Sequence, residues 1–236
     1  MEGRRYMELT GNYRHELKYQ ISLADYYALR RRLMPVMKRD THTGMDGLYT
    51  IRSVYFDNYR DKALREKTDG VQLREKFRIR YYNDDFSFIT LEKKIKHNNL
   101  CMKVDARITQ EEYEKILCEP GVWMLSHPQP LVRELYCKMK TQQLKPRVLV
   151  SYVREPYIYE AGNVRVTFDS HIRTSLFQRS FARGNIPDIS ATDVPGDMIL
   201  EVKFDAFLPD IIACLLQSEG LRQQAFSKYG ACRRFG

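Results

Sequence analysis

Basic side chains occupy every second position from Arg74 to Arg80. Successive side chains of a β-strand point to opposite faces, so this spacing predicts a strand with one cationic and one apolar face. The cationic face holds Arg74, Lys76, Arg78 and Arg80, and the apolar face holds Phe77, Ile79 and Tyr81. Like charges at this spacing repel, so such a face is stable mainly when water solvates it or when it binds an anion. Its chemistry would be anion binding, whereas the plainer interpretation is a solvated strand outside an antiparallel sheet.

The same alternation of charged and apolar residues recurs in other segments, which favours the anion site. The charged faces hold Glu16 and Lys18; Thr90, Glu92, Lys94 and Lys96; Lys103, Asp105 and Arg107; Tyr152 and Arg154; Arg165, Thr167 and Asp169; and Glu201 and Lys203. Most of these ionisable groups are basic, and unpaired cations enclosed together would each cost several kcal/mol. A cavity lined by these faces would therefore require a polyanion. The minority of carboxylates suits a hard divalent cation that phosphates also coordinate.

Sequence patterns divide the chain into the elements that must position these residues. Strands are predicted at 13–21, 50–57, 74–82, 86–95, 101–108, 146–155, 164–169 and 198–204. Helices are predicted at 22–35, within 57–68, and at 109–118, 131–144 and 209–219. Glycine, proline and polar residues predict loops at 38–49 and 181–196. Strands therefore dominate, with helices between them.

Strands with one apolar and one charged face permit two arrangements. One is an open sheet with its charges in water, and the other is a closed barrel with charges in its lumen. Closure removes exposed sheet edges, and helices outside would cover the apolar faces. We therefore predict an α+β fold, a closed antiparallel β-barrel of about eight strands with helices packed outside. A length of 236 residues suits one domain of this kind, so residues 1–236 are predicted to form a single domain.

The composition indicates an anionic partner and a reducing compartment. The formal net charge of +9 fits nucleic acid, an acidic membrane or a phosphate-rich small molecule. The cysteines include no Cys-x-x-Cys pair, which is typical of reduced thiols in a cytosol. No apolar run reaches about 18 residues, so no membrane span is expected. Residues 1–10 are polar and charged, unlike a signal peptide, and we expect a cytoplasmic protein.

Short motifs with a common strand parity occur in a fixed order from about residue 13 to residue 230. They are Glu16-x-Lys18-Tyr19, Ser53-Val54-Tyr55-Phe56-Asp57, Arg78-x-Arg80-x-Tyr82, Glu92-x-Lys94, Tyr152-x-Arg154, Arg165-x-Thr167-x-Asp169, Leu200-Glu201-Val202-Lys203 and Phe226-Ser227-Lys228-Tyr229. This set resembles the polyphosphate polymerase domain of the vacuolar transporter chaperone (VTC) family. That family belongs to the triphosphate tunnel metalloenzymes of the CYTH-like superfamily, which share an antiparallel β-tunnel.

The resemblance implies which residues would form the site. The implied catalytic cations that contact phosphates are Lys18, Arg78, Arg80, Lys94, Arg154, Arg165, Lys203 and Lys228. The implied further substrate-binding residues are Lys96, Lys103, Tyr152 and Ser227. Glu201 would hold a catalytic Mn²⁺ or Mg²⁺. The family pattern often has histidine at the position of Lys96, so this chain departs from the family there.

The resemblance also implies an activity. ATP would bind in the tunnel, and the end of a growing inorganic polyphosphate chain would attack its γ-phosphorus in a metal-dependent reaction. Positioning and electrostatic stabilisation can supply most of the catalysis of phosphoryl transfer. The 236 residues are not expected to include the inositol-phosphate-sensing and transmembrane regions of eukaryotic members. If it couples synthesis to translocation, a separate membrane protein partner is expected to associate it with a membrane.

Other functions remain open at this stage. A tripolyphosphate or nucleoside triphosphate hydrolase of the same fold is one, with Glu16 and Glu92 helping to bind metal. A non-catalytic polyphosphate-binding module is another. Nucleic-acid binding is disfavoured, because the sequence has no RNP-like aromatic pattern, zinc-finger spacing or helix-turn-helix signature.

Overall fold

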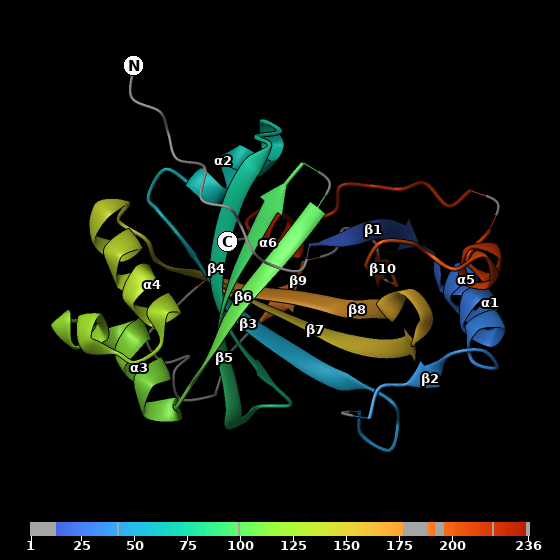
Figure 1. The fold of residues 1–236 in the computed structure, drawn as a ribbon, viewed down its shortest axis with the longest axis horizontal. Coiled ribbons are helices and arrows are strands. Elements are labelled where there is room, and N and C mark those ends of the chain that lie inside the picture. Colours follow the sequence, from blue (N-terminus) through green and yellow to red (C-terminus); the bar gives the residue numbers. More distant parts are fainter. Residues whose placement is uncertain are drawn as a thin grey trace.

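A closed ring of antiparallel strands forms the centre of the protein (Figure 1). The structure is a computed structural model that describes residues 13–41, 43–98, 100–176, 188–191, 196–218 and 220–234. The ring consists of β1 (Arg14–Ile21), β3 (Tyr49–Asp57), β4 (Leu73–Tyr82), β5 (Asp85–His97), β6 (Leu100–Ile108), β7 (Lys145–Tyr159), β8 (Val164–Leu176) and β10 (Met198–Phe204). Its order is β7, β3, β4, β5, β6, β1, β10 and β8, and β8 pairs with β7 to close it. The predicted closed arrangement of eight antiparallel strands is confirmed.

Helices and two short strands connect the members of the ring. The helices are α1 (Leu23–Leu33), α2 (Lys62–Thr68), α3 (Gln110–Cys118), α4 (Pro130–Thr141), α5 (Asp210–Leu215) and α6 (Lys228–Cys232), with the 3₁₀ turns η1 (Val122–Ser126) and η2 (Ala161–Asn163). The short strand β2 (Lys38–Arg39) pairs with β7, and β9 (Ile189–Ser190) pairs with β8. Predicted capping boxes begin α1 and α3, where Ser22 and Thr109 accept the third helical N–H.

The apolar strand faces point outward and are covered by helices on two sides of the ring. Helices α3 and α4 pack on β3 to β6, and α1 and α5 pack on β1, β7, β8 and β10 (Figure 1). Phe77, Ile79 and Tyr81 are almost completely buried in the first of these clusters. Because strand side chains alternate, the charged residues between them point into the ring.

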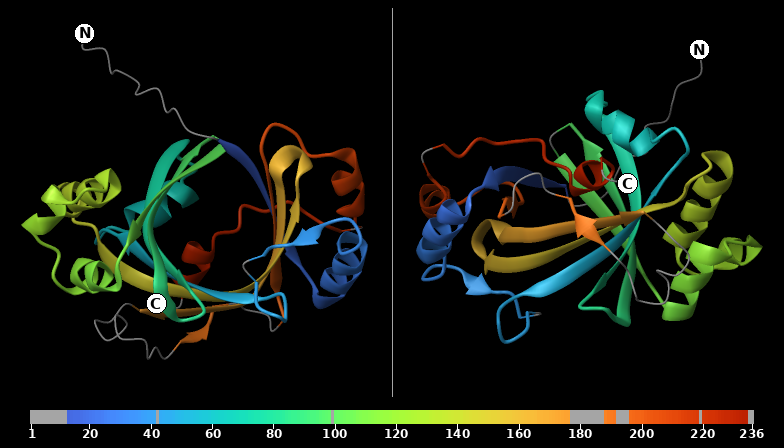
Figure 2. Two further views of the ribbon diagram at one scale, coloured as in Figure 1. Left: turned by 60° about the horizontal axis from the view of Figure 1, so that its bottom comes forward. Right: turned by 180° about the vertical axis from the view of Figure 1, so that it is seen from behind.

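Helix α6 lies inside the ring, as the end view in Figure 2 shows. Its Tyr229 packs against Tyr55 of β3 with ring centroids 5.1 Å apart. The Tyr229 hydroxyl donates a hydrogen bond of 2.5 Å to Asp57, whose carboxylate also accepts the N–H groups of Asn58 and Ala63. The chain end thus brings Lys228 into the interior.

Several predicted element boundaries were wrong. The helix predicted at 131–144 ends at Thr141, and the one predicted at 209–219 ends at Leu215. Helix α6 was not predicted; its N-terminus is capped by Ser227, whose hydroxyl accepts the N–H of Gly230. Strands β7 and β8 are longer than predicted because they pair with each other over most of their length. The predicted loop at 181–196 lies largely outside the described residues.

The helices are short. Within the described ranges, none combines the length and the hydropathy that crossing a bilayer requires. The prediction that residues 1–236 form a single domain stays a prediction.

Candidate functional site

Contacts across the ring show that the charged faces meet inside it. Glu16 of β1 pairs with Lys94 of β5, although β6 lies between these strands. Arg154 of β7 pairs with Glu201 of β10 across β8 at 3.1 Å. Side chains of two strands that are separated by a third can contact each other only if both project from the same face of the sheet, which here is the inner face of the ring. The interior therefore joins segments that are far apart in the sequence.

Glu92 is the anion at the centre of one group of cations. Its carboxylate accepts from Arg78 at 2.7 Å and lies 3.9 Å from Arg80 and 3.5 Å from Lys103. Burial would raise the pKa of Glu92, but Arg78 and Arg80 hold it far below its usual range. Arg80 also donates to the Tyr152 hydroxyl at 3.1 Å. Glu92 is therefore ionised at neutral pH.

Asp169 is the anion at the centre of a second group. Arg154 grips its two oxygens in a forked pair of 2.6 and 2.7 Å, and Lys228 from α6 pairs with the same carboxylate. Asp169 has no exposed surface. Burial would raise the pKa of Asp169, but Arg154 and Lys228 lower it. The pairing fixes a guanidinium and an ammonium in the interior.

Glu16 and Glu201 lie side by side in a third group. Burial would raise the pKa of Glu16, but Lys18 and Lys94 lower it to about 2. The pKa of Glu201 is likewise held well below its usual range by Lys203 and Lys18, against the effect of burial. Both carboxylates are therefore negatively charged at neutral pH, next to each other. Burial also lowers the pKa of Lys203 to about 8, although Glu201 is 3.1 Å away.

Glu16 and Glu201 fit a divalent cation better than any other residues in the interior. One buried oxygen of Glu16 accepts no hydrogen bond of ordinary geometry within the described part of the chain, and the Lys18 ammonium lies 3.4 Å from it. Two adjacent carboxylates suit Mn²⁺ or Mg²⁺ when phosphate oxygens complete the coordination. Among the described residues, no group of three or more histidine, cysteine, aspartate or glutamate side chains is placed to hold a metal. A metal here would therefore depend on bound phosphate.

The remaining predicted residues have definite positions. Arg165 donates to Asp40 at 2.6 Å and to the Tyr49 hydroxyl at 2.8 Å. Lys96 is on the inner face of β5, but it forms no ion pair with a described carboxylate. The oxygen of Ser227 already serves as the cap of α6. The structure thus brings most of the predicted cations together and places Arg165 beside a counter-ion from the 38–49 loop.

The resemblance left out some interior residues. Lys76 has the same strand parity as Arg78, so the alternation on β4 was the signal that could have added it. The strand alternation also predicted that Asp169 and Glu92 point into the ring. Only the structure shows that they are the counter-ions of Arg154 and Arg78. No periodicity could reveal Asp40, because it lies in an irregular loop.

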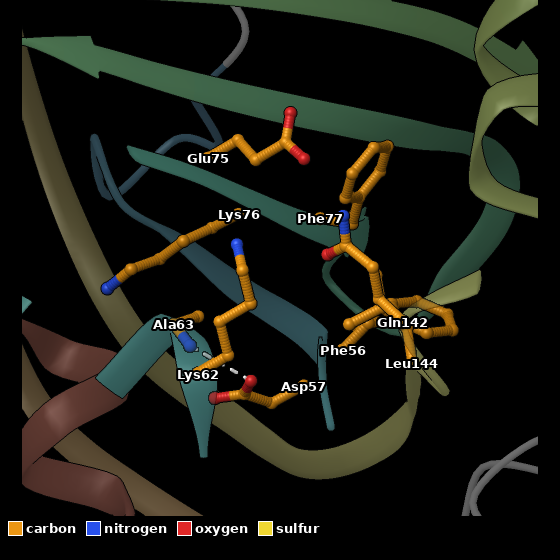
Figure 3. Close-up of a pocket in the computed structure, with 9 residues that line it drawn as sticks. All are labelled: Phe56, Asp57, Lys62, Ala63, Glu75, Lys76, Phe77, Gln142 and Leu144. Atoms are coloured by element: carbon orange, nitrogen blue, oxygen red, sulfur yellow. Dashed lines mark hydrogen bonds between the residues drawn. The ribbon is translucent and has the colours of Figure 1, made fainter. Parts of the chain in front are cut away.

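A small pocket beside α2, which Lys76 also lines, is too small to compete with this interior as a site (Figure 3). It lies between α2, β4 and the start of β7, and Phe56, Phe77 and Leu144 form its apolar wall. Its volume of about 10 Å³ leaves room for at most about one water molecule. Polyanion chemistry therefore belongs to the interior.

Comparisons with known proteins agree with this architecture. A family model described as the VTC domain matches residues 13–235. No curated protein matches the sequence. The X-ray structure of a putative adenylate cyclase from Vibrio parahaemolyticus has a TM-score of 0.51 and 10% sequence identity, over 94% of this chain and 98% of that one. At this identity the likeness shows a shared fold alone.

Two further solved structures are similar. A putative adenylate cyclase from Bacillus halodurans has a TM-score of 0.49 and 16% identity, over 89% of this chain and 88% of that one. The PH1819 protein from Pyrococcus horikoshii OT3 has a TM-score of 0.49 and 15% identity, over 95% of this chain and 100% of that one.

Proposed function

This chain belongs to the VTC domain family, and from that premise we propose that it is a metal-dependent polyphosphate polymerase. It transfers the γ-phosphate of ATP to the end of an inorganic polyphosphate chain inside the ring. One observation carries the proposal: arginines and lysines from strands all round the ring converge on a buried interior in which they outnumber the carboxylates. Such an interior is complementary to a chain of phosphates.

Substrate binding would exchange one set of ion pairs for another. Arg154 grips the two oxygens of Asp169 in forked geometry, and two nitrogens of Arg78 contact one oxygen of Glu92. Phosphates can replace these carboxylates, because they offer oxygens at a similar spacing. Lys18, Lys203 and Lys228 add point charges around them. Because each of these five cations is held by an internal partner, this part of the interior is arranged before the substrate arrives.

The reaction forms a bond from a terminal oxygen of the polyphosphate chain to the γ-phosphorus of ATP and breaks the bond to the β-phosphate, which releases ADP. The attacking oxygen is already ionised near neutral pH, so no general base is needed. Glu92, Asp169 and Glu201 are also unsuited to that role, because neighbouring cations hold their pKa values low. Their work is to orient cations, and the cations stabilise the charge on the transferred phosphoryl group.

Glu201, together with Glu16, would hold the Mn²⁺ or Mg²⁺. When bound, the ion supplies positive charge at the phosphate oxygens and helps to align them. Lys18 and Lys203 flank the two carboxylates and keep them ionised, which maintains the site for a cation.

The test is to incubate the purified protein with ATP and Mn²⁺ and to size the product on a gel. We expect chains that exopolyphosphatase degrades, and a loss of about 100-fold in Glu201→Gln. Glu111→Gln, which neutralises an exposed glutamate on α3, is the matched control and should retain full synthesis. Circular dichroism must show that both variants fold.

The other outcomes have definite meanings. Synthesis undiminished in Glu201→Gln would overturn the metal assignment. Orthophosphate and ADP without polyphosphate would identify a hydrolase, which the inward-pointing Glu16 and Glu92 would serve. Tight binding of polyphosphate without turnover in any divalent metal would identify a binding module.

A further inference from the structure

A distinct group of cations lies at the end of β4 and β5 next to α2. It consists of Lys67 from α2, Arg74 and Lys76 from β4, and Lys96 from β5, and we call it the cation cluster. Arg74 stands directly opposite Lys96 in the strand register, and Lys76 stands opposite Lys94. All four side chains of the cluster are half-buried. Like charges placed opposite each other destabilise a sheet, so folding does not explain this arrangement.

The cation cluster lacks the counter-ions that the rest of the interior has. Within the described part of the chain, none of its members forms an ion pair with a carboxylate. The charged groups that act most strongly on the Lys76 ammonium are all cations: Lys18 of β1, Lys94 of β5, Arg74 of its own strand and Lys67 of α2. From α6, the ring of Tyr229 lies 5.1 Å from its ammonium group.

Three carboxylates close to the cluster are already engaged. Asp57 accepts hydrogen bonds from Tyr229 and from two backbone N–H groups. Glu16, the carboxylate that acts most strongly on Lys96, is paired with Lys94 and Lys18. Glu75 points to the other face of β4, where it pairs with Lys93 and Lys138. Figure 3 shows Lys76 extending away from Glu75 and Phe77.

Burial, together with the lack of counter-ions among the described residues, makes Lys76 easier to deprotonate. Burial, and then the repulsion of Lys18 and Lys94, lower the pKa of Lys76 to about 7. The pKa values of Lys67 and Lys96 are also lowered, with burial as the largest cause. A protein retains such a costly group of charges without a partner more readily when a ligand supplies the missing anion.

We propose that the cation cluster is a second anion subsite, which binds the phosphates of a polyphosphate chain that extend beyond the triphosphate held near Glu201. The inference rests on the proposed function in taking polyphosphate as the ligand. Lys94 connects the two sites, because it pairs with Glu16 and stands opposite Lys76. The ring thereby distinguishes a long chain from a triphosphate.

The first test compares the binding of long-chain polyphosphate and of tripolyphosphate by titration calorimetry without metal or ATP. The wild type should bind the long chain more tightly. Lys76→Met, which keeps an unbranched side chain against Tyr229, should lose about tenfold in affinity for the long chain and clearly less for tripolyphosphate. Lys96→Gln should act in the same direction. Lys115→Gln, a change at an exposed lysine of α3, is the control and should bind both ligands like the wild type.

The second test uses pH. Binding an anion favours protonated Lys76, so the affinity for the long chain should fall as the pH rises above about 7. Tripolyphosphate has the same terminal phosphates, so the pH dependence of its binding reports their contribution. Lys76→Met should reduce the pH dependence that remains for the long chain, in which Lys67 and Lys96 also share.

The outcomes separate this proposal from the polymerase. The second subsite would be overturned if Lys76→Met lost the same affinity for both ligands, or lost no affinity for the long chain. This conclusion would hold even if the protein makes polyphosphate. A selective loss for the long chain would establish the subsite even if no synthesis is observed, because the binding assay requires no turnover.

Discussion

At the scale of single residues, buried carboxylates hold the interior together. Asp169 has no exposed surface and neutralises Arg154 and Lys228, which come from β7 and α6. Removing one partner from a buried ion pair leaves a charge that water does not solvate. The carboxylates of the interior therefore matter for stability as much as the cations matter for binding.

The first prediction concerns Asp169→Asn. The change leaves Arg154 and Lys228 together without their shared anion, and we expect a loss of about 3–5 kcal/mol in the free energy of unfolding, measured by urea denaturation. Asp205→Asn removes the partner of Arg14 at a half-exposed position and should cost under about 1 kcal/mol. Similar losses in the two variants would contradict the burial argument.

The second prediction concerns Lys76 and pH. Its pKa falls from 10.5 to about 7 on folding, so between these values the unfolded chain binds more protons and stability rises with pH. The destabilisation by Lys76 is therefore complete below about pH 7 and disappears toward pH 10.5. Lys76→Met should raise the melting temperature below about pH 7, and the difference from the wild type should shrink as the pH increases. A difference in melting temperature that does not change with pH would show that the charge of Lys76 does not destabilise the fold.

At the scale of elements, α6 depends on the strands around it. A helix of five residues is too short to be stable alone, so its contacts with β3 hold it inside the ring. Tyr229 supplies these contacts through its ring, which packs on Tyr55, and through its hydroxyl, which binds Asp57. The position of Lys228 follows from this attachment.

The third prediction tests that attachment. Tyr229→Phe keeps the packing on Tyr55 but leaves one oxygen of Asp57 without its donor, which should cost about 1–3 kcal/mol in the free energy of unfolding. The measurement is thermal or urea unfolding. Tyr27→Phe alters an exposed tyrosine of α1 and should change stability by less than about 0.5 kcal/mol. Equal changes in the free energy of unfolding would mean that the buried hydroxyl of Tyr229 stabilises the protein no more than an exposed one.

At the scale of the whole molecule, positive charge from many strands is concentrated in one interior. A polyanion that binds there contacts most strands of the ring at once and binds only the folded state. Such a ligand stabilises the fold by mass action, by about 2.7 kcal/mol at a concentration of 100 times Kd. Salt should weaken this effect, because counter-ions screen the exposed part of the attraction.

The fourth prediction follows. Tripolyphosphate should raise the melting temperature of the wild type in a concentration-dependent way, and sodium chloride at the same ionic strength should not. Arg78→Gln should reduce the shift, because Arg78 lies in the interior beside Glu92. An equal shift with both salts would indicate a general ionic effect instead of a binding site. Differential scanning fluorimetry measures all of these shifts.

The sequence by itself determined the alternating strands, the parity of their charged faces and the family. These features are local: a period of two residues assigns each side chain to a face, and the apolar faces then require cover. That is why the predicted charged faces, including Arg78, Glu92 and Glu201, lie inside the ring. It is also why the predicted capping boxes of α1 and α3 were confirmed.

Only the tertiary structure decided which charges have partners. The pairing of Asp40 with Arg165, the entry of Lys228 from α6 and the contact of Glu16 with Glu201 join segments that no local pattern relates. Closure of the ring by β7 and β8 set these distances. The same closure left Lys76 among cations. Ion pairing depends on the distance between side chains in space, and the spacing of residues along the chain does not contain that distance.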